Sequence, residues 1–322
     1  MDDVIATLRG WLDGPDDVRL VVETSGSTGA PKRVMLSRAA VLASVAATER
    51  RLGAAGRWAL VLPPSYVAGV QVICRSLFAG HQPVTQWPDP ADSETWFTSL
   101  VPTQLLRFLD SHADLAALRT AHTILLGGGR IEPELRARAA DEGLRVVTTY
   151  GSAETAGGCV YDGMPLDGVA VAIGTEGRIR MAGPTLFDGY DGDPELTAGA
   201  LVDGWFLTSD AGRLDEDGRL TVFGRLDDMV ISGGVNVPAP AVAARLRQHP
   251  GVADAEVLGV PDPEWGDRLV AFVVGDLDLE AAREWVAAEH PRSWAPRQVV
   301  VVQKIPLLVN GKPDRVALRR LA

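Results

Sequence analysis

The chain has 322 residues, of which 46% are hydrophobic, and a formal net charge of −11. This length suits one large domain with a smaller one, and the apolar content excludes global disorder. The acidic balance argues against nucleic acid as a partner, because a phosphate backbone would be repelled. Cys74 and Cys159 form no disulfide framework, and the acidic start leads into no long apolar run. We therefore expect a soluble cytoplasmic protein without a signal peptide or a membrane span.

Helices and strands alternate through the first half of the chain. Residues 1–12 predict a short amphipathic helix, and Val18–Glu23 predicts a buried strand. A helix should then begin after Ser37, a plausible N-cap, and run to about Leu52, where Gly53 can end it. Strands separated by helices indicate a largely parallel sheet that is covered on both faces. The further elements predicted in this half are strands at 58–62, 123–126 and 145–149 and helices at 69–78 and 133–141.

Short strands and turns replace this alternation after about residue 165. Strands are expected at 177–180, 205–208 and 219–223, and they predict a small barrel or a twisted antiparallel sheet. From Asp227 onward the pattern is mixed again and predicts a compact α+β module. We accordingly place a domain boundary between a larger α/β domain, 1–226, and a smaller domain, 227–322. The elements expected in the smaller domain are helices at 239–248 and 279–289 and strands at 253–260, 269–274 and 298–302.

A loop of small polar residues follows the first predicted strand. It reads Thr24-Ser25-Gly26-Ser27-Thr28-Gly29-Ala30-Pro31-Lys32. Glycines let backbone N–H groups turn toward an anion, the hydroxyls add donors, and Lys32 adds a mobile positive charge. The spacing differs from that of a Walker loop. The loop therefore predicts a polyphosphate site, although the same composition also fits a flexible linker.

Two further motifs stand at the ends of predicted strands. One is Leu126-Gly127-Gly128-Gly129-Arg130, and the other is Thr149-Tyr150-Gly151-Ser152-Ala153-Glu154-Thr155. The carboxyl ends of strands in an open α/β sheet are where ligands bind. Bare glycine backbone admits a flat ligand, an aromatic ring can lie on a base, and Glu154 can hold a metal ion that bridges phosphate oxygens. Both motifs also have a purely structural interpretation. The three glycines would then form a tight turn, and Glu154 would be an acid at a helix N-terminus.

Charged residues recur around the strands of the second half. Asp210 follows a predicted strand, where a carboxylate can accept hydrogen bonds from both hydroxyls of a ribose. Arg225, in Gly224-Arg225-Leu226-Asp227-Asp228, can reach the same sugar or its phosphate. A hairpin with surface charges explains Asp215 and Asp217 well, but it explains Asp210 poorly.

In this order the motifs resemble those of the adenylate-forming superfamily, which comprises acyl-CoA synthetases, peptide-synthetase adenylation domains and luciferases. The terminal Asn310-Gly311-Lys312 completes the pattern, which runs from about residue 20 to the end. The resemblance implies an N-terminal domain with parallel sheet layers and a small β subdomain, followed by a mobile α+β lid. It also implies an enzyme that makes an acyl-AMP from a carboxylic acid and ATP and passes the acyl group to a thiol. Mg²⁺ and coenzyme A are implied as cofactors.

The resemblance also implies roles for individual residues. Lys312 would be the adenylation lysine, Glu154 the Mg²⁺ ligand, Thr28 a further catalytic residue and Asp227 the hinge of the lid. The residues implied to bind ATP or coenzyme A are Thr24, Ser25, Gly26, Ser27, Thr28, Gly29 and Lys32 around the phosphates, Gly127, Gly128, Gly129 and Tyr150 with the adjoining Gly151 and Ser152 around adenine, Asp210 and Arg225 at the ribose, and Gly233 and Gly234 along the pantetheine tunnel.

The chain departs from the family pattern at three places. Arg33 follows Lys32 where a glycine is common, and Ala153 stands where a threonine is usual. We expect both changes to modulate phosphate binding without abolishing it. Far fewer residues precede the glycine loop than in most members, so we expect an acyl pocket that is less enclosed or is completed by a partner.

Within the superfamily, the chain resembles the compact actinobacterial forms of the o-succinylbenzoate–CoA ligases of menaquinone biosynthesis. The resemblance rests on the short chain and on the segment Thr98–Leu105. Such a substrate is an aromatic dicarboxylate, so one carboxylate is activated and the other needs a partner. Arg75 interrupts the apolar run 69–78, and a buried cation requires an anion. The alternative is an arginine that reaches the surface or pairs with a local acid. Further substrate candidates are Ser99, Thr103 and Tyr66, of which Tyr66 could gate the pocket or belong to the core.

Three functions share these motifs. The first is a ligase that joins o-succinylbenzoate, or another aryl or acyl acid, to coenzyme A. The second is an adenylation enzyme that loads a carrier protein, and the third is a non-catalytic relative that senses nucleotide or serves as a subunit. The presence of Lys312, Glu154 and Asp210 favours an enzyme, whereas the short N-terminal region favours the third reading. The scattered histidines show no metal-ligand spacing. Homodimers are common in the family, but no segment locates an interface.

Overall fold

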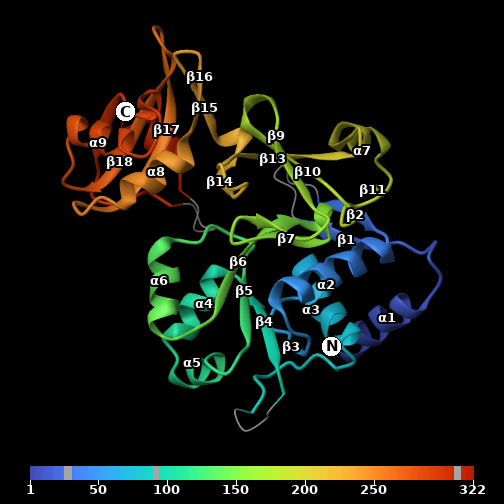
Figure 1. Ribbon diagram of the computed structural model, residues 1–322. Coiled ribbons are helices and arrows are strands. Elements are labelled where there is room, and N and C mark those ends of the chain that lie inside the picture. The colour runs from blue at the N-terminus through green and yellow to red at the C-terminus, as the bar shows by residue number, and fades with distance from the viewer. Residues whose placement is uncertain (25–30, 90–93, 308–312) are drawn as a thin grey trace. The chain divides into compact units, whose positions relative to one another are not determined.

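The computed structural model describes residues 1–24, 31–89, 94–307 and 313–322, so the predicted site residues Ser25, Gly26, Ser27, Thr28, Gly29 and Lys312 lie outside the described part. The chain forms two compact units (Figure 1). The domain boundary between residues 226 and 227 stays a prediction. The first unit comprises 1–172, 180–208 and 214–220, and the second comprises 173–179, 209–213 and 221–322.

A six-stranded sheet forms the centre of the first unit, in the order β3-β4-β5-β6-β7-β8. Strands β3 to β6 pair in parallel, whereas β7 and β8 join the sheet antiparallel. The predicted largely parallel sheet is therefore confirmed for these four strands. The strand bounds are β3 Arg57–Ala59, β4 Trp96–Leu100, β5 Thr123–Leu126, β6 Val146–Ser152, β7 Gly157–Tyr161 and β8 Met164–Pro165.

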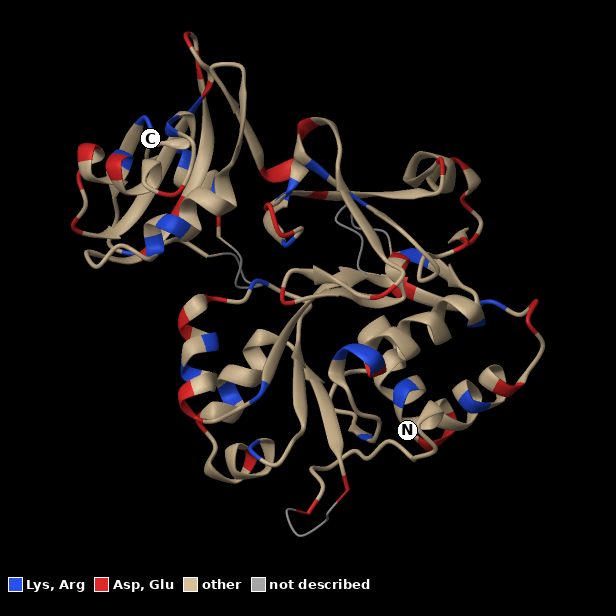
Figure 2. Ribbon diagram, viewed as in Figure 1, with Lys and Arg blue, Asp and Glu red and all other residues tan. Residues whose placement is uncertain are grey.

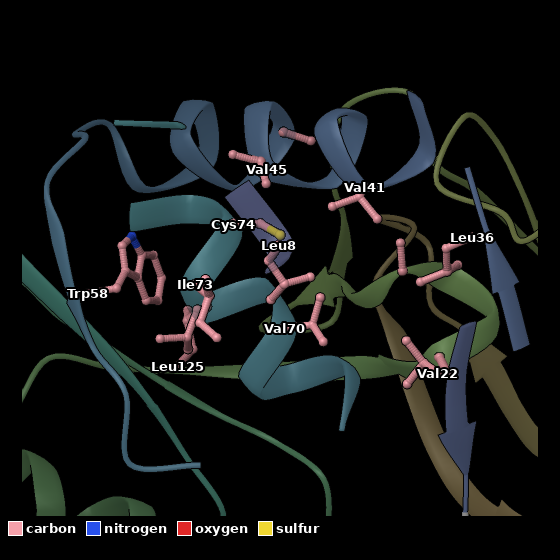
Figure 3. Packing of buried hydrophobic residues seen from close by; sticks show 14 of the residues in the cluster. Leu8, Val22, Leu36, Val41, Val45, Trp58, Val70, Ile73, Cys74 and Leu125 are labelled. Atoms are coloured by element: carbon pink, nitrogen blue, oxygen red, sulfur yellow. The ribbon is translucent and has the colours of Figure 1, made fainter. Parts of the chain in front are cut away.

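Both faces of this sheet are covered by helices, as the alternating pattern predicts. Leu125 of β5 packs into one hydrophobic cluster, while its neighbours Ile124 and Leu126 pack into another. In the first cluster, Ile73 lies between Leu125 and Val45 (Figure 3). Strands β4 and β5 carry no charged side chain, whereas the outer helix α6 carries both signs (Figure 2). The helices are α2 (Arg38–Leu52) and α3 (Val67–Phe78) on one face, and α4 (Pro102–Leu109), α5 (His112–Leu118) and α6 (Pro133–Asp141) on the other.

Local capping sets the ends of α2, as the sequence predicts. The Ser37 hydroxyl accepts a hydrogen bond from the Ala40 backbone N–H at 3.1 Å. Gly53 ends the helix in the left-handed region, with a φ of 73°. The predicted N-terminal helix is also confirmed as α1 (Asp2–Asp13), whose apolar side chains Leu8 and Trp11 pack into the same cluster as α2 and α3.

The glycine loop connects the two strands of an antiparallel hairpin. β1 (Leu20–Thr24) pairs with β2 (Lys32–Leu36), so Thr24 and Lys32 face each other where the loop begins and ends. A third strand, β11 (Gly189–Tyr190), pairs with the other edge of β2. The sequence predicted the strand before the loop, but it is not a buried strand, because only Val22 of β1 is buried. The returning strand was not predicted. This pairing brings Lys32 and Tyr190 onto adjoining strands.

Strands follow between residues 165 and 226, as predicted, but the strand expected at 205–208 continues to Leu214, so Asp210 lies on a strand and not after one. These strands form a sheet in the order β12-β13-β10-β9, with β14 pairing with β13. One short helix, α7 (Pro194–Ala200), leads into β12. The strand bounds are β9 Ala170–Ile173, β10 Arg178–Ala182, β12 Leu201–Val202, β13 Trp205–Leu214 and β14 Leu220–Arg225.

The C-terminal part of the second unit is an α+β module with its own hydrophobic core. Its sheet has the order β16-β15-β18-β17, and β19 pairs in parallel with β18. The predicted helices and strands are present with bounds shifted by up to three residues, and the hairpin β15–β16 is an addition. The elements are β15 Met229–Ser232, β16 Val235–Pro238, α8 Ala239–Arg247, β17 Val252–Asp262, β18 Gly266–Gly275, α9 Leu279–Ala287, β19 Gln298–Val301 and α10 Arg315–Arg319.

In the six-stranded sheet, two predicted strand bounds are wrong for identifiable reasons. The strand expected at 58–62 ends at Ala59, and the Val61 carbonyl accepts a hydrogen bond from the Gln104 side chain at 2.9 Å instead of one from a strand. The strand expected at 145–149 continues to Ser152, because β7 pairs with it antiparallel along that stretch. The Tyr150-Gly151-Ser152 segment therefore lies on a strand and not after one.

No helix in the described ranges is both long enough and apolar enough to cross a membrane. Cys74 and Cys159 are buried free thiols, and burial raises the pKa of each to about 12. Both thiols therefore stay protonated near neutral pH and act as small apolar core residues.

Candidate active site

A cavity of about 120 Å³ lies in the first unit, beside the ends of β5 and β6 and against helix α3. Part of its wall is apolar, with Leu62, Val67, Leu100 and Leu125. Another part is bare backbone, because the glycines of two predicted motifs meet here. The predicted site residues that line the cavity are Arg75, Ser99, Gly127, Gly128 and Gly151.

The glycine part of the wall has no room for side chains at two positions. A Cβ atom on Gly127 would lie 2.3 Å from the Thr149 hydroxyl oxygen. One on Gly151 would lie 2.2 Å from the Gly157 carbonyl oxygen. Both distances are far shorter than a van der Waals contact. Packing alone therefore requires glycine at these two positions, whether or not a flat ligand binds there. Gly129 and the half-buried Tyr150 do not line the cavity.

Arg75 brings a positive charge into the cavity wall. The residue is 6% exposed, its Nη2 donates to the Tyr161 hydroxyl at 3.3 Å, and its guanidinium lies 5.0 Å from the centre of the Trp58 ring. Its Nε atom has no hydrogen-bond partner among the described residues, and no carboxylate among them forms an ion pair with it. The alternatives of a surface arginine and of pairing with a local acid are therefore wrong for this part of the chain. A buried cation of this kind favours binding of an anion.

Gln71 and Tyr161 are polar residues of the cavity that the sequence analysis missed. Gln71 lies one helical turn before Arg75; its Nε2 donates to the Ala156 carbonyl at 2.6 Å, while its buried Oε1 has no partner in the described chain. The Tyr161 hydroxyl also hydrogen-bonds Thr48 at 3.0 Å, which fixes the ring that contacts Arg75. The four-residue spacing from Arg75 was a usable signal for Gln71. Tyr161 carried no comparable signal.

Two substrate candidates do not reach the cavity. Tyr66 is the residue before α3 and is 52% exposed, so its alternative assignment to the core is wrong. Thr103 is exposed in the first turn of α4. Neither side chain lines the cavity. Helix α3 turns Arg75 inward and leaves Tyr66 at its outer end, a difference that the linear sequence did not reveal.

A second group of site residues surrounds Glu154. This residue is 8% exposed, and its Oε1 accepts a hydrogen bond from the Tyr190 hydroxyl at 2.9 Å. The Lys32 ammonium lies 5.4 Å from the centre of the Tyr190 ring. Burial, together with the negative charge of Glu154, raises the pKa of Tyr190, so the hydroxyl remains a donor at working pH. The structure thus brings Glu154 and Lys32 together around a tyrosine that the sequence analysis did not single out.

The donor set at Glu154 fits a magnesium ion. Mg²⁺ prefers oxygen ligands and is commonly held by one or two carboxylates together with substrate phosphates. The hydrogen bond from Tyr190 uses one of the two carboxylate oxygens of Glu154. Within the described ranges, no group of three or more His, Cys, Asp or Glu side chains could hold a metal ion. Glu154 would therefore share the ion with phosphate oxygens and not with a protein cage.

Replacing Tyr190 with phenylalanine is expected to weaken magnesium binding. The change removes only the hydroxyl that orients Glu154, and loss of such a partner typically lowers metal affinity about 10–100-fold. The measurement is the Mg²⁺ concentration that gives half-maximal ATP–pyrophosphate exchange. Tyr161→Phe is the matched control, because it removes a buried hydroxyl that contacts Arg75 instead. An unchanged magnesium requirement in Tyr190→Phe would contradict the orienting role.

Five further predicted site residues belong to the second unit, whereas Thr24 and Ser152 end β1 and β6 in the first. Asp210 lies on β13 and Arg225 ends β14; the Arg225 Nη2 donates to Asp227 Oδ2 at 3.3 Å. Asp227 is exposed in a one-turn helix, η3 (Leu226–Asp228). Gly233 and Gly234 form the turn between β15 and β16, both with positive φ. The Asp215 side chain accepts hydrogen bonds from the backbone N–H groups of Asp217 and Arg219. This confirms the prediction that Asp215 is a surface charge at a hairpin.

Comparisons with known proteins identify the family of the chain. Residues 11–191 match the family described as AMP-binding enzyme, and residues 241–312 match the family described as AMP-binding enzyme C-terminal domain. The chain is 42% identical to a probable 2-succinylbenzoate–CoA ligase of Mycobacterium tuberculosis, over 99% of the chain and 88% of that protein. It is 33% identical to a feruloyl-CoA synthase of an Amycolatopsis species, over 95% of the chain and 70% of that protein.

The fold is also similar to that of a solved structure, the o-succinylbenzoate CoA synthetase of Bacillus subtilis in complex with its acyl-adenylate intermediate. The TM-score is 0.73 at 26% identity, and the match covers 93% of this chain and 68% of the other.

Proposed function

The chain belongs to the AMP-binding enzyme family, the AMP-forming acyl-CoA ligases, and we propose on this premise that it joins o-succinylbenzoate to coenzyme A. A carboxylate is a poor electrophile, because its negative charge repels nucleophiles and oxide is a poor leaving group. Attack of the carboxylate on the α-phosphate of ATP would give an acyl-AMP and release pyrophosphate. The thiol of coenzyme A would then displace AMP and form the thioester.

The observation that supports this substrate is that Arg75 is buried and forms no ion pair with a carboxylate of the described residues. o-Succinylbenzoate has two carboxylates, and only one is activated. The cavity pairs an apolar wall, suited to an aromatic ring, with one buried guanidinium, suited to the second carboxylate. A monocarboxylic acid would leave this cation without a partner. The similarity to the mycobacterial and Bacillus proteins supports the same substrate class.

Roles for the other residues follow the same proposal. Lys32 and the glycine loop would hold the β- and γ-phosphates, and Gly127, Gly128 and Gly151 would receive the adenine against bare backbone. Glu154, oriented by Tyr190, would hold Mg²⁺. A bound magnesium ion would neutralise charge that develops on the phosphates. Asp210 and Arg225 would bind the ribose, and Lys312 would approach the α-phosphate.

The test is ATP–pyrophosphate exchange with a panel of acids, followed by transfer to coenzyme A or to a carrier protein. The panel contains o-succinylbenzoate, 4-oxo-4-phenylbutanoate, which lacks the ring carboxylate, and ferulate. We expect exchange to be fastest with o-succinylbenzoate and the thiol acceptor to be coenzyme A. Exchange with ferulate alone would favour a different aryl-CoA ligase, as the similarity to feruloyl-CoA synthase suggests. Transfer only to a carrier protein, or no exchange at all, would overturn the proposal.

A further inference from the structure

Tyr161, in the wall of the cavity, connects two helices that cover the same face of the sheet. It is the last residue of β7 and is 1% exposed. Its hydroxyl accepts a hydrogen bond from Arg75 Nη2 of α3 at 3.3 Å and lies 3.0 Å from the Thr48 hydroxyl of α2. Thr48 is also 1% exposed, and it does not line the cavity. Three buried polar side chains are therefore linked in a row, and two of them border the cavity.

The donors and acceptors of this row decide where the proton of the Tyr161 hydroxyl is directed. A guanidinium can only donate, so the Tyr161 oxygen is the acceptor in its bond with Arg75. The Thr48 hydroxyl has no hydrogen-bond partner besides Tyr161 in the part of the chain that the structure describes. If Tyr161 donated to Thr48, the buried Thr48 proton would lack an acceptor, which is costly. If Thr48 donates instead, its proton is satisfied and the Tyr161 proton is left for a group in the cavity.

Arg75 supplies a second donor beyond its bond to Tyr161. Its Nε is buried and has no hydrogen-bond partner among the described residues. Gln71, one helical turn earlier, has an unpartnered Oε1, but this atom is an acceptor and offers nothing to an anion. Arg75 and Tyr161 together thus present a positive charge and a neutral hydroxyl donor. A carboxylate, which accepts several hydrogen bonds, fits this pair.

We propose that Tyr161 is a specificity-determining residue, whose hydroxyl donates a hydrogen bond to the second carboxylate of the substrate beside Arg75. The inference rests on the proposed function, in which that carboxylate binds Arg75. In a site shielded from water, a hydrogen bond to a charged group is stronger than one between neutral groups. An acid without the second carboxylate leaves the Tyr161 proton without an acceptor. Tyr161 therefore favours the dicarboxylate and also disfavours its monocarboxylic analogue.

The experiment measures the KM values of Tyr161→Phe for o-succinylbenzoate and for 4-oxo-4-phenylbutanoate, by ATP–pyrophosphate exchange. We expect the KM for o-succinylbenzoate to rise about 10-fold or more, because a hydrogen bond to a charged group is lost. The KM for 4-oxo-4-phenylbutanoate should stay within about twofold or fall, because the variant leaves no hydroxyl proton unpaired. The ratio of the two KM values separates this effect from a general loss of folded protein, which thermal unfolding measures independently.

Two variants on α2 are the matched controls. Thr48→Val removes the bond that Thr48 donates but keeps the Tyr161 proton, so the ratio of the KM values should change by less than about threefold. Ser44→Ala removes another buried hydroxyl, one helical turn earlier, which donates to the Ala156 carbonyl at 3.2 Å. This second variant should leave the ratio unchanged.

Two results would overturn the inference. One is an unchanged ratio of KM values in Tyr161→Phe. The other is a loss in Thr48→Val as large as that in Tyr161→Phe, because Tyr161 would then donate to Thr48 and only hold Arg75 in place. The unaltered protein and Arg75→Leu are measured alongside. If Arg75→Leu loses the preference for the dicarboxylate and Tyr161→Phe keeps it, the inference alone fails. If the unaltered protein has no such preference, the proposed substrate fails and the inference falls with it.

Discussion

Replacing Lys312 with alanine is expected to lower the rate of acyl-AMP formation by about 10²–10³, because one preorganised charge partner of the reacting phosphate is lost. The second half-reaction, thiolation of added acyl-AMP, should remain largely intact. ATP–pyrophosphate exchange and single-turnover thioester formation measure the two steps separately. Lys312 lies outside the described residues, so this prediction rests on the motif.

A matched control for Lys312 is available in the same part of the chain. Lys304→Ala removes an exposed lysine shortly before Lys312 in the sequence, and both half-reactions should be unchanged. Lys32→Ala removes the remaining lysine and should impair exchange through weaker phosphate binding, seen as a higher KM for ATP. An equal loss of both half-reactions in Lys312→Ala would refute the assigned role. If Lys312 is only a solvent-exposed lysine near the C-terminus, its replacement should change the rate of neither half-reaction.

Replacing Arg75 with leucine is expected to raise the KM for o-succinylbenzoate by about 30-fold or more. Loss of one partner of a buried, hydrogen-bonded charge pair costs about 2–5 kcal/mol, and each 1.4 kcal/mol is about tenfold in affinity. The KM for 4-oxo-4-phenylbutanoate, which lacks the ring carboxylate, should change far less. The ratio of the two KM values measures the contribution of the second carboxylate directly. Equal effects on both acids would discard the assignment of Arg75.

Controls for Arg75 must separate recognition from packing, because its guanidinium lies over Trp58. Arg245→Leu removes a comparably buried arginine that lies over Trp285 and does not line the cavity. That variant should lose stability without changing the ratio of the two KM values. Arg75→Lys keeps a positive charge and should recover part of the preference for the dicarboxylate.

Local sequence signals predicted the elements whose ends depend on local interactions. Ser37 and Gly53 set the ends of α2 through a cap and a left-handed residue, and the helix has the predicted bounds. The strand at 58–62 was predicted too long, because a side chain from α4 binds its carbonyl group. The strand at 145–149 was predicted too short, because a later antiparallel strand extends its pairing. Gln104 lies 43 residues from Val61, and β7 begins only after β6 has ended, so neither effect could be read from the residues of the strand itself.

The sequence by itself determined the family, because its motifs occur in the family's order. It also determined the alternation of strands and helices, which places glycines at the ends of strands. Only the tertiary structure decided which polar residues meet. It points Arg75 into a cavity whose described lining contains no acid, leaves Tyr66 exposed, and brings Tyr190, 36 residues away in sequence, into contact with Glu154. The physical reason is that motif spacing reflects backbone geometry along one segment. The environment of a charge depends on side chains that segments distant in sequence bring together.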